Sequence, residues 1–290
     1  MYFDLCIPHD DSDVTIHRQR LQTLETLGFN GACAVQSAAG QVSASDRCRI
    51  QATDMTVERK ALPPSLMIAQ RATSLVSSKP FQQFTRLTVS TSEPFQPQSW
   101  LEVIRSYDIA AVRPFSERAL QQACTSLEVD IISLDLGQRL PFKLRPQYID
   151  AACKRDVRFE IQYSSGLRDQ ASRRHLFSNA QALSRLLRGR NLVISSGARN
   201  MMELRGPKDI INMGTLFGMS QEKAKRAISE NCEAVLARGA ARKLHFGVMT
   251  LVPASASAHR GAPCHGFESH NPTASSGGSS VRSDKKKRVS

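Results

Sequence analysis

The fold is decided by three consecutive stretches, VRFEIQY at 157–163, DQASRRHLFSNAQALSRLLR at 169–188 and NLVISS at 191–196. The first and third are short, apolar and rich in β-branched or aromatic residues, which is typical of buried strands. The middle stretch carries apolar residues at helical spacing, at Leu176, Ala180, Leu183 and Leu187. Asp169 can cap this helix and Gly189 can end it. The sequence therefore predicts strand, helix and strand in succession.

The same alternation extends toward the N-terminus. Further strands are expected at Tyr2–Ile7, Gly31–Val35, Phe84–Thr91, Asp108–Val112 and Val129–Leu134. Helices are expected between Ile16 and Leu27 and over Ser116–Cys124 and Pro146–Lys154, whereas residues 36–80 allow no assignment. Strands too apolar to be half-exposed indicate a parallel sheet covered by helices. At least seven strands favour an α/β fold with a closed or nearly closed TIM-like barrel over an open doubly wound sheet.

Helical segments are also expected after the last strand. Pro207 sits where a helix can begin, and Ser220 and Ser229 can cap the two short helices that follow. Gly218 and Gly239 can end the segments before the next turns.

The charge is distributed unevenly along the chain. The 290 residues carry a formal net charge of +13. Residues 1–150 are nearly neutral, whereas residues 151–246 hold 18 Lys and Arg against 8 Asp and Glu, and 13 of the 18 cations are arginine. The guanidinium fork matches phosphate geometry and stacks on bases. This segment therefore predicts a polyanionic partner, and the alternative is a basic domain whose charge serves solubility.

Several protein classes are disfavoured. The longest apolar runs fall far short of a membrane span, and no basic segment precedes an apolar one at the N-terminus, so neither a membrane helix nor a secretory signal is expected. The seven cysteines contain no CxxC pair. They fit reduced thiols in the cytosol or nucleus better than a disulfide framework or a zinc ribbon.

The C-terminal composition predicts a boundary between a barrel domain, residues 1–246, and a disordered basic tail, residues 247–290. This tail is rich in Pro, Ser, Gly and His and lacks an apolar pattern. It ends in Lys285, Lys286, Lys287 and Arg288, which indicate a nuclear localisation signal or an auxiliary nucleic-acid contact. The spacing of its histidines and Cys264 fits no standard metal module.

Evidence for a catalytic site is weak. His9, Asp10, Asp11 and Asp13 follow the first strand, where a barrel places catalytic groups, and they could hold a metal ion. Aspartates are equally favourable at the helix N-terminus that follows, and we prefer that explanation. The sequence contains neither a P-loop nor a glycine-rich dinucleotide motif. Gly197 could turn backbone amides toward a phosphate, but a tight turn explains it equally well.

A series of short motifs now points to a family. In order they are FTRLT at 84–88, YDIAAV at 107–112, LEVDI at 127–131, RLPF at 139–142, FEIQY at 159–163, LRD at 167–169, RR at 173–174, NLVISS at 191–196, ELRGP at 203–207 and LFG at 216–218. The chain resembles the barrel-shaped protein subunit, of about thirty kilodaltons, of ribonuclease P and ribonuclease MRP. The resemblance covers residues 1–246 and is most specific over 157–246.

The resemblance implies a barrel like that of the polymerase and histidinol phosphatase phosphoesterases, without their active site. Those enzymes begin their metal site with two histidines on the first strand, and here Cys6 and Pro8 stand at those places. Family members pair with a small ferredoxin-like subunit and help to stabilise the catalytic RNA that removes 5′ leaders from precursor tRNA, or that cuts precursor rRNA in the MRP particle. Arg113 departs from the family pattern, which has an apolar residue before that proline.

These observations define the expected site and partners. We expect no catalytic, metal or cofactor site, and a location in the nucleus and nucleolus. The expected partners are the particle's catalytic RNA, the small ferredoxin-like subunit and further subunits. The expected RNA contacts are Arg168, Arg173, Arg174, Arg185, Arg188, Arg190, Arg199, Arg205 and Lys208. The alternative function is a free-standing metal-dependent phosphoesterase on the same kind of barrel.

Overall fold

The computed structural model describes residues 1–9, 14–53 and 80–244. Its seven strands are parallel and follow one another in sequence order around the sheet: β1 (Phe3–Pro8), β2 (Gly31–Ala39), β3 (Gln82–Thr91), β4 (Ile109–Pro114), β5 (Ile131–Ser133), β6 (Arg158–Gln162) and β7 (Leu192–Ser195). All seven expected strands are confirmed, with ends shifted by a few residues.

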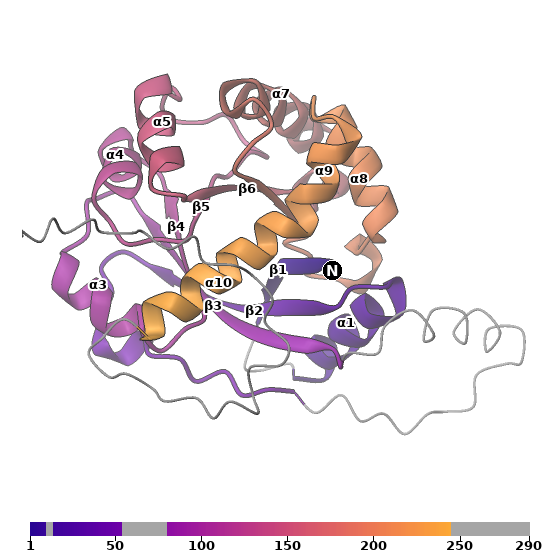
Figure 1. The fold of residues 1–290 in the computed structure, drawn as a ribbon, viewed down its shortest axis with the longest axis horizontal. Helices are drawn as coiled ribbons and strands as arrows, with labels where there is room; N and C mark the ends of the chain where they lie inside the picture. Colours follow the sequence, from indigo (N-terminus) through magenta and orange to yellow (C-terminus); the bar gives the residue numbers. More distant parts are fainter. Residues whose placement is uncertain (10–13, 54–79, 245–290) are drawn as a thin grey trace, which may run out of the picture. The chain divides into compact units, whose positions relative to one another are not determined.

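The sheet curves into a nearly closed barrel (Figure 1). The gap between β1 and β7 is bridged just beyond the end of β7, where Gly197 N donates to Cys6 O at 2.9 Å and Ser196 N donates to the Asp4 carboxylate at 3.1 Å. Gly197 has φ +60°, and an added Cβ would lie 3.1 Å from the Gln162 side chain. The TIM-like α/β barrel is therefore confirmed, and Gly197 is explained by this turn.

Helices cover the outside of the strands. They are α1 (Val14–Leu27), α3 (Pro97–Ile104), α4 (Glu117–Thr125), α5 (Pro146–Lys154), α6 (Ser165–Arg168), α7 (Gln170–Leu187), α8 (Pro207–Leu216) and α9 (Gln221–Ile228), with 3-10 turns η1 (Ala44–Asp46) and η2 (Met201–Glu203). The main core lies between this layer and the outward strand residues, among them Leu87, Val112 and Ile161. No described helix is both long and apolar enough to span a bilayer.

The helix α7 matches its sequence pattern closely. The Asp169 side chain accepts from Ser172 N at the start, and Arg188 adopts a left-handed conformation with φ 52° at the end, followed by Gly189 at φ 65°. The predicted apolar positions are buried, together with Ser184. The helix therefore packs one face on the barrel and leaves the other to solvent.

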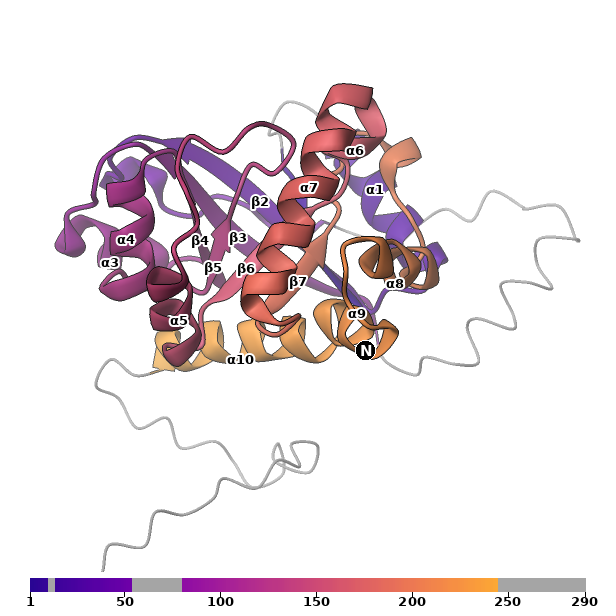
Figure 2. The same ribbon diagram turned by 90° about the horizontal axis from the view of Figure 1, so that it is seen from above.

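The last helix, α10 (Glu230–Leu244), lies across one end of the barrel (Figure 2). Cys232 and Val235 pack with Phe3 and Val193 in a small apolar cluster at the strand starts. We call this end the base. The opposite end, where the strands finish, we call the mouth.

Two expectations around α10 were wrong. Gly239 does not end a helix, because α10 runs through it to Leu244. A Cβ at Gly239 would lie 1.9 Å from Asp108 O, so glycine lets the helix approach the barrel closely. Ser229 does not act as an N-cap either, because its hydroxyl donates backward to Lys225 O at 2.8 Å. The Ser220 cap is confirmed, since its side chain accepts from Lys223 N.

The expectations for residues that the structure does not describe remain predictions. The boundary at residue 246 and the tail, residues 247–290, lie outside the described residues, as do Asp10, Asp11, Asp13 and the basic cluster at 285–288. The unassigned stretch 36–80 contains the end of β2 and η1, and its residues 54–79 are not described.

Candidate nucleic-acid interface

The interior of the barrel holds a fully buried ion pair. Arg86 from β3 donates to both Glu160 carboxylate oxygens on β6, at 2.5 and 2.7 Å, and both side chains have no exposed surface. Ser195 Oγ also donates to Glu160 at 2.7 Å. Burial alone would raise the pKa of Glu160, but the Arg86 charge and these hydrogen bonds outweigh it and lower the pKa to about 2. The pair therefore stays ionised.

A further polar layer lies above this pair toward the mouth. Gln162 Nε2 donates to Ser133 Oγ at 3.1 Å and to Cys6 Sγ at 3.3 Å. Arg113 Nη2 donates to Gln162 Oε1 at 3.0 Å, with Ser133 Oγ at 3.4 Å. This explains the arginine that departs from the family pattern, because its side chain completes the interior hydrogen-bond network.

Of the candidate metal ligands that follow β1, His9 is the one that the structure describes. His9 packs edge to face on His17 of α1, with ring centroids 4.6 Å apart. Burial, then His9 and Arg20, lowers the pKa of His17 to about 4, so this ring is neutral near pH 7. Within residues 1–9, 14–53 and 80–244, no three His, Cys, Asp or Glu side chains are grouped so that they could hold a metal ion. The polar groups of the interior bind one another instead.

The structure separates the nine predicted RNA contacts into two groups. The mouth group lies at the start of α7 and around the loops after β6 and β7: Arg168, Arg173, Arg174, Arg199, Arg205 and Lys208. The base group lies at the far end of α7: Arg185, Arg188 and Arg190. The 14 residues from Arg174 to Arg188 span about 20 Å along a helix. The predicted site is therefore not one compact patch.

One member of the mouth group is engaged within the fold. Arg168 Nε and Nη2 donate to the Glu203 carboxylate at 2.7 and 2.8 Å. Glu203 is buried and also accepts from Arg199 N at 2.9 Å. Burial alone would raise the pKa of Glu203, but the Arg168 hydrogen bonds lower it. Arg168 therefore ties α6 to η2, a partnership that spacing along the chain could not indicate.

The other eight cations make no ion pair within the described part of the chain. Seven are exposed, and Arg205 is half-buried with Nη1 donating to Met202 O and Leu204 O. Arg173 Nε donates to Gly166 O at 2.8 Å. Their charge is thus available to an external anion.

The base group has a neighbour that the sequence analysis missed. Lys223 of α9 donates to Arg188 O at 2.8 Å, and its chain packs where a Cβ on Gly189 would stand. Lys223 and Arg188 are separated by 35 positions. Only the docking of α9 beside the end of α7 brings them together.

Other cations of the basic segment are neutralised at the base. On α10, Arg238 lies 3.3 Å from the Asp130 carboxylate, Arg242 also pairs with Asp130, and Lys243 lies 2.6 Å from Asp108. Arg155 pairs with Glu128 at 3.5 Å. These carboxylates belong to the first half of the chain. Part of the charge asymmetry along the sequence is therefore cancelled in space.

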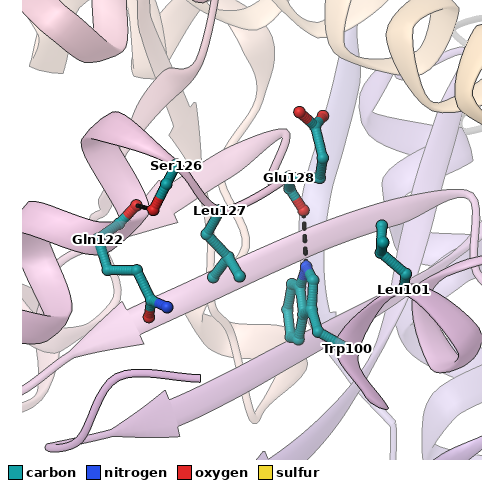
Figure 3. Close-up of a pocket in the computed structure, with 6 residues that line it drawn as sticks. All are labelled: Trp100, Leu101, Gln122, Ser126, Leu127 and Glu128. Atoms are coloured by element: carbon teal, nitrogen blue, oxygen red, sulfur yellow. Dashed lines mark hydrogen bonds between the residues drawn. The ribbon is translucent and has the colours of Figure 1, made fainter. Parts of the chain in front are cut away.

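A small cavity between α3 and α4 does not resemble a ligand site. It measures about 110 Å³ and is lined by Trp100, Leu101, Gln122, Ser126, Leu127 and Glu128 (Figure 3). The Trp100 indole donates to Glu128 O at 2.7 Å, and the Glu128 carboxylate points away from the ring. Small-molecule sites usually measure about 300–1,000 Å³. The space is a gap in helix packing.

Comparisons with known proteins identify relatives of this chain. The profile of the family described as RNase P subunit p30 matches residues 1–244. Protein GAMETOPHYTE DEFECTIVE 1 of Arabidopsis thaliana is 36% identical over 253 residues, covering 82% of this chain and 44% of that protein. Ribonuclease P protein subunit p30 of Mus musculus is 34% identical over 206 residues, covering 69% and 77%. Ribonuclease P/MRP protein subunit RPP1 of Saccharomyces cerevisiae is 30% identical over 175 residues, 60% of each.

A solved structure shares the fold. A chain of an archaeal ribonuclease P bound to mature tRNA superposes with a TM-score of 0.58 at 14% identity, covering 86% of this chain and 98% of that one. At such low identity the likeness supports the barrel alone.

Proposed function

Since this chain belongs to the RNase P subunit p30 family, we propose that it is an RNA-associated protein subunit of a ribonuclease P particle. In this role it contributes no catalytic group, and the particle's RNA cleaves the 5′ leader of precursor tRNA. The likeness to the yeast subunit, whose name includes MRP, supports a second place in ribonuclease MRP and in rRNA processing.

The observation that carries this proposal is the set of exposed cations along and around α7 that make no ion pair with any residue that the structure describes. Arg174 and Arg185 lie opposite the buried stripe of that helix, Arg188 follows its last residue, and all three are exposed. Phosphates are the anions that arginine binds with two parallel hydrogen bonds. Backbone contacts of this kind position a protein on RNA without reading its sequence.

The phosphoesterase alternative receives no support from the interior of the barrel. Cys6, where such an enzyme would place an imidazole, accepts a hydrogen bond from Gln162. Arg86 and Glu160 form an ion pair with each other. To test it, the purified chain is assayed with a phosphodiester substrate and Mn²⁺, Mg²⁺ or Zn²⁺. Turnover that disappears in a His9→Ala variant would revive the alternative.

The direct experiment is affinity purification of the tagged chain followed by sequencing of the bound RNA and identification of bound proteins. The proposal expects the RNA of ribonuclease P, the RNA of ribonuclease MRP, and a small subunit of ferredoxin-like fold. Recovery of the chain without any RNA would contradict it.

Nuclear and nucleolar location is part of the same proposal. It rests on the sequence of Lys285, Lys286, Lys287 and Arg288, a basic cluster of the kind that nuclear import recognises. Replacing the four residues with alanine should lower nuclear accumulation of a fluorescent fusion. An unchanged distribution would place the import determinant elsewhere or show that it enters with a partner.

A further inference from the structure

The loop between β5 and α5 displays its cations in a regular pattern. We call residues 139–145 the strap. Arg139, Pro141, Lys143 and Arg145 are exposed, whereas the alternating Leu140, Phe142 and Leu144 are partly buried against the core. All three cations of the strap are thus directed to solvent by the burial of their neighbours.

The strap is fixed at both ends. On the side of β5, Asn179 of α7 donates to Leu136 O at 3.0 Å and to Gln138 O at 2.8 Å. On the side of α5, Arg145 Nε lies 2.8 Å from the Glu117 carboxylate, and its guanidinium lies 5.9 Å from the Tyr148 ring centre. A surface held in this way loses little conformational entropy when it binds.

An exposed aromatic ring stands beside this anchored end. Glu117, the partner of Arg145, begins α4, and two residues earlier Phe115 is 41% exposed at the end of β4. The backbone of Phe115 is held by donation to Thr91 O at 2.8 Å. Arg118 is exposed on the first turn of α4. An aromatic face and a row of cations therefore occupy adjoining loops on the mouth side.

The cations of this surface are available to bind an external anion. Arg118, Arg139 and Lys143 form no ion pair with any described residue, and the one carboxylate in the row, Glu117, is engaged by Arg145. None of these residues belongs to the nine cations of the candidate interface. The surface is thus separate from the mouth group and the base group.

We propose that Phe115, Arg118, Arg139 and Lys143 bind a single-stranded segment of RNA. The cations contact successive phosphates and the Phe115 ring stacks on an unpaired base. A single strand exposes its bases, whereas a duplex hides them in its stack, so a free aromatic face beside cations favours the single strand. The inference rests on the proposed function and adds to it the form of RNA that one face recognises.

The test uses the full chain and two labelled probes, a short oligouridylate and an RNA duplex of the same length. Phe115→Ala should weaken oligouridylate binding about tenfold and leave duplex binding unchanged. Arg139→Glu with Lys143→Glu should lower the slope of log affinity against log salt by roughly 0.7 per lost contact for the single strand. Phe115→Tyr, which keeps an aromatic face, should bind like the original.

A matched control is Lys154→Glu with Lys225→Glu, two exposed lysines on α5 and α9 that lie outside every proposed surface. This variant should retain the slope of log affinity against log salt for oligouridylate. Circular dichroism should show that all variants are folded. An equal loss of duplex binding in Phe115→Ala would overturn the single-strand inference. So would unchanged oligouridylate binding, or loss of a protein partner with RNA binding intact.

The proposed function fails in a distinguishable way. If the strap variants bind oligouridylate normally while reversal of the mouth and base groups abolishes RNA binding, only the strap inference is overturned. If the original chain binds neither probe and purifies without RNA, both are overturned.

Discussion

The two ends of the barrel use the same kind of side chain differently. At the base, Arg238, Arg242 and Lys243 of α10 pair with Asp130 and Asp108 and hold the helix across the strand starts. At the mouth, cations such as Arg174 and Lys208 are exposed and make no ion pair within the described residues. The first set stabilises the fold, and the second is free for an anion. Net charge counted along a sequence therefore overstates the charge offered to a partner.

Between the two ends, the buried pair of the interior gives the largest expected effect. Arg86→Met leaves Glu160 buried without its counter-ion, which costs about 3–5 kcal/mol of unfolding free energy. Urea denaturation followed by circular dichroism measures this loss. Arg86→Met with Glu160→Leu removes both charges and should recover part of it, although Ser195 then lacks its acceptor. A loss under about 1 kcal/mol in the single variant would mean that the interior is hydrated.

The base should be sensitive to a single added methyl group. Gly239→Ala places Cβ 1.9 Å from Asp108 O, so α10 must move and its ion pairs lengthen. We expect a loss of about 3 kcal/mol, the upper part of the usual range for overpacking. The control is Ala240→Ser, one position along on the exposed side. Equal stability of the two variants would show that α10 does not sit tightly on the barrel.

Gly239 also marks the limit of prediction from the sequence. Periodicity, caps and strand length gave all seven strands and the bounds of α7 to within a residue, because those features are local. Gly239 was expected to end a helix, since a close approach to Asp108, 131 positions away, leaves no local trace. The helix α3 was missed because Gln96 stands at its N-cap position and makes no side-chain cap, whereas the equally short α9 was marked by Ser220.

The candidate site was predicted only in part for the same reason. The arginine stripe of α7 follows from helical spacing, and its exposure is confirmed. The engagement of Arg168 by Glu203 and of Arg242 by Asp130 could not be foreseen, since the partners are 35 and 112 positions apart. Which cations are free depends on the tertiary structure.

The pH dependence of stability contrasts Asp4 with His17, two groups buried on different elements. Burial raises the pKa of Asp4 from 3.8 to about 6. The contribution of Asp4 to the unfolding free energy is therefore fully present below pH 3.8 and is lost as the pH rises through 6. Burial lowers the pKa of His17 from 6.5 to about 4. Its contribution to the unfolding free energy is therefore present above pH 6.5 and is lost as the pH falls through 4. The two effects oppose each other, and the original chain should show a shallow profile there.

The Asp4→Asn variant separates them. It keeps an oxygen for Cys6 N and Ser196 N and removes the charge. Its unfolding free energy relative to the original should rise by about 2 kcal/mol between pH 4.5 and pH 7.5, measured by urea titration at each pH. A difference that does not change with pH would mean that Asp4 is ionised in the folded chain across this range.

The smallest effect on stability is expected where the effect on binding is greatest. Arg174→Glu with Lys208→Glu alters the mouth group, and Arg185→Glu with Arg188→Glu alters the base group. All four side chains are exposed without ion pairs among the described residues, so each pair should change the unfolding free energy by less than about 0.5 kcal/mol. If each residue contacts one phosphate, each pair lowers the salt slope for the particle RNA by roughly 1.4 to 1.8. Sites about 20 Å apart along α7 should act independently, so the salt slope of the fourfold variant should fall by the sum of the two decreases.

A salt slope that falls for one pair only would place the RNA at that end of the barrel and leave the other end for a protein neighbour. No change in either pair, in folded protein, would remove α7 from the RNA surface.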